Sequence, residues 1–396
     1  MNAFRPKLTP LEDRALASAG GVALPAPLSV VPAAVRASAE QAQRAPAPAV
    51  LTDLEGIREQ ADLPALAGGL VVNGRLEGTA ATGVRERGRA TPVGADDQFH
   101  LGSNGKAMTA TLAAVLVERG LLRWTTTLGQ ALPEVRGGMS PAYRNVTLEQ
   151  LLNHRGGFID ENVSADLLGR LTAFRGNGYQ ARQTFLRELL RTPAGAVGEF
   201  SYSNGGYALA AALMERATGN SYEWLMQKYV FNPLGMTSAG FGAPGRGYGL
   251  LDQPRGHDAS WKSVGNGPGA DLPAALNPAG LMHMSMGDWS KFLRVHLGER
   301  VNGVKLLSAA SLSKLHTPDP RPVDAAGHRY GFGWVSIQTD LGPALWHDGS
   351  NGFWHSEALL IPSKGVAAFA VTNQAGAAAE AGVGAALAAL LARAER

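Results

Sequence analysis

Residues 97–106 read Asp-Gln-Phe-His-Leu-Gly-Ser-Asn-Gly-Lys. A short apolar segment ends in Gly102, and Ser103 then precedes a second apolar segment, 107–117, whose pattern predicts a buried helix. Ser103 and Lys106 lie three residues apart, so on a helix the hydroxyl and the amine share one face. The first four N–H groups of a helix lack intrahelical partners, so the Ser103 N–H can also face an oxyanion. The stretch therefore predicts a nucleophilic serine beside a lysine.

Two shorter motifs farther along the chain supply groups that could activate such a serine. They are Tyr202-Ser203-Asn204 and His347-Asp348-Gly349-Ser350. A hydroxyl is a weak nucleophile until a neighbouring base takes its proton, and an amine, a phenol or an imidazole can do so. Each motif alone is common. Ser-x-x-Lys recurs from Ser311 and Tyr-x-Asn from Tyr143, two residues that we expect at the surface or in a helix cap.

Composition narrows the class of protein. The chain has 396 residues, of which 45% are hydrophobic and 17% charged, enough for one large domain or two ordinary ones. Its net charge of +3 gives no reason to expect nucleic acid or an anionic membrane as a partner. The chain has no cysteine, which excludes thiol nucleophiles and disulfides. We find no apolar run long enough to span a bilayer, and the oligomeric state stays open.

Other hydrolase classes fit less well. Nine histidines are present, but without a His-Glu-x-x-His motif, so we expect neither a metal ion nor another cofactor. The absence of Gly-x-Ser-x-Gly disfavours an α/β-hydrolase.

The first 50 residues differ from the rest of the chain. They are rich in proline and alanine and show no sustained period, so we expect a disordered or leader segment. A basic start followed by weakly apolar residues suggests a signal peptide, although Gly20, Gly21 and Pro25 interrupt it. We therefore favour export, to the periplasm or the cell surface, over the cytoplasm.

Signals for strands lie at the two ends of the remaining chain. Asn73-Gly74 favours a tight hairpin turn after an apolar run, and strands are expected at 330–337, 344–347, 356–361 and 366–372. A helix is expected over 378–394. Between these ends, helix starts are expected at Thr147, Asn204, Ser221 and Ser285.

Strands at both ends must pair to bury their faces. We therefore expect a discontinuous α/β (α+β) domain, 51–120 and 300–396, in which an antiparallel sheet is flanked by helices. A mostly helical region, 121–299, is inserted between the two parts.

The order and spacing of the motifs resemble those of the penicillin-recognising serine hydrolases, specifically the class C β-lactamase-like branch, whose architecture agrees with this expectation. That branch includes carboxylesterases, D-aminopeptidases, DD-peptidases and β-lactamases. Further stretches that fit its pattern are 151–157 (Leu-Leu-Asn-His-Arg-Gly-Gly), 232–236 (Asn-Pro-Leu-Gly-Met), 278–281 (Pro-Ala-Gly-Leu) and 330–334 (Tyr-Gly-Phe-Gly-Trp). The resemblance runs from about residue 55 to the C-terminus and implies the β-lactamase/transpeptidase-like fold.

The resemblance also implies a role for each catalytic residue. Ser103 attacks a carbonyl carbon and forms an acyl-enzyme. Lys106 accepts the serine proton or lowers the pKa of Tyr202, which is the better candidate for the proton shuttle. The charges of Lys106 and His347 would favour the Tyr202 phenolate. His154 is expected to be structural, bonding backbone near the site.

Three further residues are expected to bind the substrate. Asn204 would hydrogen-bond the substrate carbonyl or the Lys106 amine. The N–H groups of Ser103 and Ser350 would form the oxyanion hole. Gly349 would let the strand backbone approach the substrate closely, where a Cβ would obstruct it.

His347 is also informative about the substrate. Lactamases of the branch usually carry lysine there, a permanent cation that suits a carboxylate, whereas histidine is at most partly charged at pH 7. We therefore expect a serine hydrolase for small esters or amides, with carboxylesterase first, DD-peptidase or D-aminopeptidase second and β-lactamase third. A catalytically silent, penicillin-binding-like envelope protein is the alternative from another class.

Overall fold

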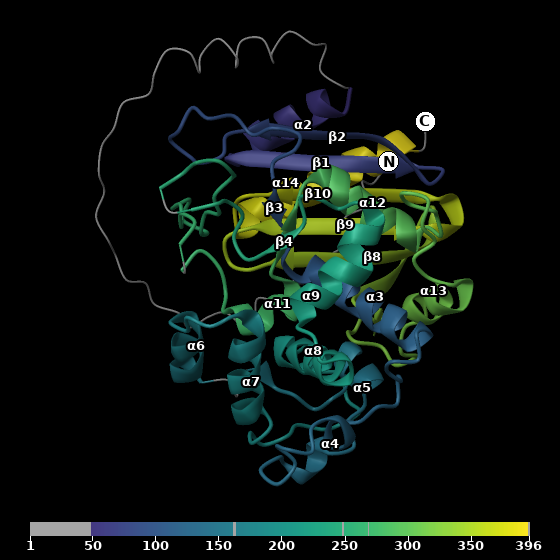
Figure 1. The fold of residues 1–396 in the computed structure, drawn as a ribbon. Helices are drawn as coiled ribbons and strands as arrows, with labels where there is room; N and C mark the ends of the chain where they lie inside the picture. Colours follow the sequence, from purple (N-terminus) through teal and green to yellow (C-terminus); the bar gives the residue numbers. More distant parts are fainter. Residues whose placement is uncertain (1–48, 161–163, 248, 268, 395–396) are drawn as a thin grey trace.

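A seven-stranded antiparallel sheet forms the centre of the molecule in the computed structural model, which describes residues 49–160, 164–247, 249–267 and 269–394 (Figure 1). The strand order is β2-β1-β10-β9-β8-β7-β6. The seven strands are β1 (Ala65–Val72), β2 (Arg75–Gly83), β6 (Arg329–Gly331), β7 (Trp334–Thr339), β8 (Gly342–Ser350), β9 (His355–Ile361) and β10 (Val366–Thr372). The expected leader, 1–50, lies outside the described residues except for its last two.

The sheet joins the two ends of the described chain. Leu66 in β1 pairs with Thr372 in β10, and Asn73 and Gly74 turn β1 into β2 with φ of +51° and +71°, as a type I′ hairpin requires. Side chains alternate along β10. Ala368 and Ala370 face one layer, and Phe369 faces the other. This confirms the predicted antiparallel sheet of terminal strands.

Helices cover both faces of this sheet. Helices α2 (Ala49–Gln60) and α14 (Ala377–Ala394) pack on one face, while α3 (Gly105–Glu118) and α12 (Met286–His296) belong to the core on the other. The helices of the inserted region and the last short one before β6 are α4 (Leu128–Ala131), α5 (Leu148–Leu152), α6 (Ala165–Thr172), α7 (Gly178–Leu189), α8 (Asn204–Thr218), α9 (Tyr222–Met226), α10 (Asn232–Leu234), α11 (Asn277–Gly280) and α13 (Ala309–His316). Helices α4 to α8 of the inserted region lie on the side of α3 that faces away from the sheet (Figure 1).

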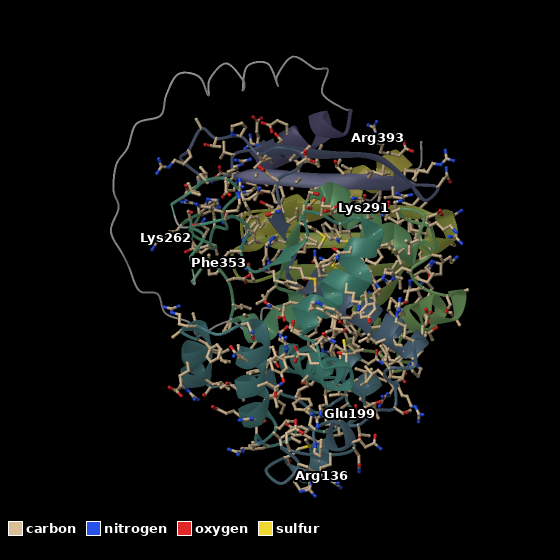
Figure 2. The ribbon with its side chains drawn as sticks, in the orientation of Figure 1. Arg136, Glu199, Lys262, Lys291, Phe353 and Arg393 are labelled. Carbon is tan, nitrogen blue, oxygen red and sulfur yellow. The ribbon has the colours of Figure 1, made fainter. Side chains whose placement is uncertain are left out.

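The inserted region also contributes strands, which we did not expect. β4 (Gly240–Phe241) and β5 (Met282–Met284) form a small sheet with β3 (Phe99–His100), the strand just before Ser103. Charged side chains such as Arg136 and Lys262 lie at the periphery of the molecule (Figure 2).

Two local predictions need correction. The strand expected over 330–337 is two strands, because Phe332 and Gly333 adopt positive φ (+52° and +87°) and turn the chain. Asn204 is not the cap of α8. Ser203 caps it, accepting a hydrogen bond from Gly206 N, which leaves the Asn204 side chain available for other contacts.

We expected no apolar run long enough to span a membrane, but helix α14 is long and apolar enough to do so. By length and composition alone its 18 residues, with a mean hydropathy of 1.4, could cross a membrane. The helix nevertheless packs on the sheet through Val383, Leu387 and Leu390. A helix that covers a protein core passes the same composition test, so this is weak support for a membrane span.

Candidate active site

The turn before α3 brings the backbone of Ser103 against the end of β8. Gly102 has φ of +51°, and a Cβ on it would lie 2.3 Å from Ser350 N. A Cβ on Gly349 would lie 2.6 Å from Ser103 N and 2.3 Å from Leu101 O. Both positions require glycine, because no side chain fits between the two segments. The two expected oxyanion donors, on Ser103 and Ser350, therefore belong to backbones in direct contact.

Lys106 is fully buried and has three hydrogen-bond acceptors. Its Nζ lies 2.6 Å from Ser103 Oγ, 2.8 Å from Asn204 Oδ1 and 2.7 Å from Ala279 O. An ammonium can donate to all three. A neutral amine can still donate to Asn204 and Ala279, which leaves its lone pair for the hydroxyl proton of Ser103. The arrangement thus accommodates lysine before and after proton transfer.

Tyr202 lies beside this lysine. Lys106 Nζ is 4.6 Å from the centre of the Tyr202 ring, and the ring packs against His154 at a centroid distance of 4.3 Å. The neighbouring backbone is held on both sides, because Ser201 N donates to His154 O and Ser203 N donates to His154 Nδ1. These bonds agree with the structural role expected for His154, whose φ of +56° is uncommon for a residue other than glycine.

His347 is buried at the end of β8, with its ring centre 6.4 Å from that of Tyr202. Its Nδ1 bonds the carbonyl of Asp348, so Nδ1 carries the proton and Nε2 faces the Tyr330 hydroxyl at 3.4 Å. Burial, together with the charge of Lys106, lowers the pKa of His347 to about 3. The imidazole is therefore neutral at pH 7, and the expectation that its charge favours a Tyr202 phenolate is wrong. Only Lys106 of that pair can supply the charge.

Asp160 is a further residue of the site that sequence reasoning missed. It accepts hydrogen bonds from Ser203 Oγ (2.6 Å), Asn204 N (2.7 Å) and Gly205 N (3.2 Å), at the N-terminus of α8. Burial raises the pKa of Asp160, although these donors act in the opposite direction. No local pattern marks this aspartate, because its partners lie more than 40 residues away in the sequence.

The structure thus brings the seven predicted site residues together in one site. They are Ser103, Lys106, Tyr202, Asn204, His347, Gly349 and Ser350. Of the two contacts considered for Asn204, the one with the Lys106 amine is present. Within the part of the chain that the structure describes, no three His, Asp or Glu side chains gather as a metal ion would require.

The second copies of the motifs lie elsewhere. Ser311 is in the first turn of α13, and the lysine of its motif, Lys314, forms an ion pair with Glu149. We expected Tyr143 at the surface or in a helix cap, and this expectation is wrong. Tyr143 is fully buried, stacks on Phe158 and donates a hydrogen bond to Pro193 O.

A sheet built from both ends of the chain, with a serine and a lysine at the start of the helix packed against it, places this protein among the serine hydrolases of the β-lactamase and penicillin-binding-protein class. The chain belongs to the Beta-lactamase family, whose model matches residues 50–393.

Individual relatives of the chain have different activities in their names. Penicillin-binding protein 4 of Amycolatopsis lactamdurans is 28% identical over 339 residues, covering 81% of this chain and 83% of the relative. Lovastatin esterase of Penicillium rubens is 27% identical over 290 residues, covering 66% and 69%. The structure of D-alanine carboxypeptidase AmpC from Burkholderia cenocepacia superposes with a TM-score of 0.69 at 20% identity, over 87% of this chain and 97% of that one. That last match shows the shared fold.

Proposed function

We propose that the protein is a carboxylesterase that hydrolyses small, uncharged esters through an acyl-enzyme on Ser103. The observation that carries the proposal is the neutral, buried His347 at the position where lactamases of the branch usually carry lysine. An imidazole whose pKa is lowered to about 3 offers no positive charge to a substrate carboxylate at neutral pH. Penicillins and peptide C-termini carry such a carboxylate, whereas a simple ester does not.

The proposed reaction has two stages. Ser103 Oγ attacks the ester carbonyl carbon while its proton passes to Lys106 Nζ or to the Tyr202 oxygen. The electron pair of the carbonyl moves onto its oxygen, which the N–H groups of Ser103 and Ser350 stabilise. When the C–O bond breaks, the leaving alkoxide takes back that proton and departs as the alcohol. Water then attacks the acyl-enzyme by the same route, and the carboxylic acid leaves.

His347 and Asn204 act as positioning residues in this scheme. Asn204 Oδ1 holds Lys106 Nζ, and the Nδ1 of His347 holds the carbonyl of Asp348, one residue before Gly349. Neither needs to exchange a proton with the substrate.

A panel of three substrates tests the preference. Kinetics are measured with p-nitrophenyl acyl esters, D-amino-acid p-nitroanilides and a chromogenic cephalosporin, with Ser103→Ala as the blank. We expect kcat/KM for the acetyl or butyryl ester to exceed that for the other two by about tenfold or more. Efficient turnover of the cephalosporin with little hydrolysis of the esters would overturn the proposed order.

D-peptide hydrolysis is the second candidate. It is favoured by the names of the relatives, a penicillin-binding protein and a D-alanine carboxypeptidase, rather than by the charge at His347. In the same panel, D-peptide hydrolysis predicts a higher kcat/KM for the D-amino-acid p-nitroanilides than for the esters.

A further inference from the structure

Asp271 connects the two backbone segments that carry the expected oxyanion donors. One carboxylate oxygen accepts a hydrogen bond from Asn351 Nδ2 at 2.9 Å, and the other lies 3.0 Å from His100 Nε2. Asn351 directly follows Ser350, and His100 precedes Ser103 by three residues. The side chain of His100 is fully buried, and that of Asp271 is 8% exposed. Asp271 itself belongs to neither segment, because it lies in the connection between β4 and α11.

The hydrogen bond that the His100 ring accepts from Gly102 fixes its tautomer. Gly102 N donates to His100 Nδ1 at 3.1 Å, so Nδ1 must present a lone pair. Nε2 then carries the proton and lies 3.0 Å from an oxygen of the Asp271 carboxylate, a close contact between a positive N–H and a negative group. The imidazole is thus held between the Gly102 N–H, which donates to it, and the Asp271 carboxylate, which it contacts, and its position sets the orientation of the peptide between Leu101 and Gly102.

The orientation of the peptide between Leu101 and Gly102 affects both expected oxyanion donors. Leu101 O accepts from Ser356 Oγ at 2.7 Å, and the next peptide along carries the Ser103 N–H. Since a Cβ on Gly102 would lie 2.3 Å from Ser350 N, any rotation of the Gly102 peptide also disturbs the second donor.

We propose that Asp271 is a positioning residue that clamps both halves of the oxyanion hole through His100 on one side and Asn351 on the other. The inference rests on the proposed acyl-enzyme function and adds a residue to it.

Asp271→Asn tests the clamp with little change in shape. The amide oxygen of the variant can still accept from Asn351 and from Leu272 N, but its amide group would face His100 as a donor. His100 must then accept at Nε2 and carry its proton on Nδ1, opposite the Gly102 N–H. We expect kcat to fall about 10- to 100-fold, less than the ~10²–10³ for loss of a whole oxyanion donor, since the donor is displaced rather than removed. KM should change less than about threefold.

A double-mutant cycle separates this mechanism from a general loss of structure. In His100→Asn, the Asn oxygen takes the place of Nδ1 and can accept from Gly102 N–H whatever residue stands at 271. Asp271→Asn should therefore cost less than about threefold in kcat when added to His100→Asn. The matched control is Asp324→Asn, which alters another aspartate–histidine pair, with His328, in an exposed turn. It should leave kcat unchanged.

The tautomer itself gives a readout that does not depend on activity. In protein labelled with ¹⁵N-histidine, the imidazole shifts of His100, identified by their absence in His100→Asn, should report Nε2–H in the native chain and Nδ1–H in Asp271→Asn. An unchanged tautomer, or a full kcat in Asp271→Asn, overturns the clamp. Failure of the proposed function would look different. Ser103 would not form an acyl-enzyme in the unaltered protein, whereas the tautomer switch would still be measurable.

Discussion

Lys106 is the residue on which the chemistry of the site depends. Its three acceptors, Ser103 Oγ, Asn204 Oδ1 and Ala279 O, come from three segments that are distant in the sequence. They hold the amine in one place in either protonation state, so a proton can move to it without a change of rotamer. A cation that cannot lose a proton would keep the contacts and lose the function.

Lys106→Arg is expected to lower kcat/KM for p-nitrophenyl acetate by about 10²- to 10⁴-fold, the usual contribution of general acid–base catalysis. The guanidinium stays charged at any accessible pH and cannot accept the serine proton. The matched control is Lys314→Arg, in the second Ser-x-x-Lys motif, where the lysine pairs with Glu149 and lies over the Phe332 ring. Equal losses in the two variants, or none in Lys106→Arg, would exclude Lys106 from the proton transfer.

At the scale of elements, two helix starts and one strand end meet at the site, and each is fixed by a contact from another element. The N-terminus of α8 is held by Asp160, and the end of β8 is held by its close approach to the Ser103 turn. Each of these two contacts can be disrupted by a single substitution.

Asp160→Asn should destabilise the protein by about 1–3 kcal/mol, because an amide nitrogen then faces backbone or hydroxyl donors in a buried place. Activity should fall as well, since Asn204 and Tyr202 flank the capping residue Ser203. Urea unfolding and ester hydrolysis measure the two effects. Asp166→Asn, in the exposed first turn of α6, is the matched control and should stay within about 0.5 kcal/mol. A stable and fully active Asp160→Asn protein would contradict this role.

Gly349→Ala should abolish most esterase activity. Its new Cβ would sit 2.3 Å from Leu101 O and 2.6 Å from Ser103 N, and neither backbone atom can move without displacing the oxyanion hole. Gly56→Ala, in α2, where a Cβ meets nothing within 4 Å, should retain activity and gain up to about 1 kcal/mol in stability. An active Gly349→Ala enzyme would show that β8 and the Ser103 turn are not rigidly apposed.

Local signals made part of this arrangement predictable. Asn73-Gly74 requires positive φ at two residues, and this pair of residues alone specifies the hairpin. Ser103 lies in the tight turn that leads into α3 and Lys106 in the first turn of α3, so their spacing of three residues still brings the two side chains together. The carbonyl of Ala279 and the carboxylates of Asp160 and Asp271 could not be predicted, because their partners are set by tertiary packing. The prediction of a charge on His347 failed for the same reason, because burial rather than residue type decides whether this histidine is charged.

At the scale of the whole molecule, several histidines are buried in the neutral form. Burial lowers the pKa of His283 and of His316 to about 4, and that of His347 to about 3. In the unfolded chain these groups take up protons near pH 6.5, before the folded protein does. Their contribution to stability is therefore present above pH 6.5 and is lost as the pH falls towards 4. His355, whose pKa is raised by Glu357 despite burial, acts in the opposite direction.

His316→Asn isolates one of these contributions. The free energy of urea unfolding is measured at pH 7, 5.5 and 4.5 for both proteins. We expect the unaltered protein to lose roughly 1–3 kcal/mol more than the variant over this range, because the variant has one neutral buried imidazole fewer to keep deprotonated. Parallel curves for the two proteins would show that His316 is equally protonated in both states.

Ser103 becomes covalently acylated in the proposed reaction, and this step can be observed directly. The protein is mixed with excess p-nitrophenyl acetate, quenched in acid within milliseconds, and digested for mass spectrometry of its peptides. We expect one acetyl group on the peptide that contains Ser103, formed during the burst of p-nitrophenol and absent in Ser103→Ala. Turnover of the ester without an acetyl group on Ser103, or with the group on another residue, would contradict it.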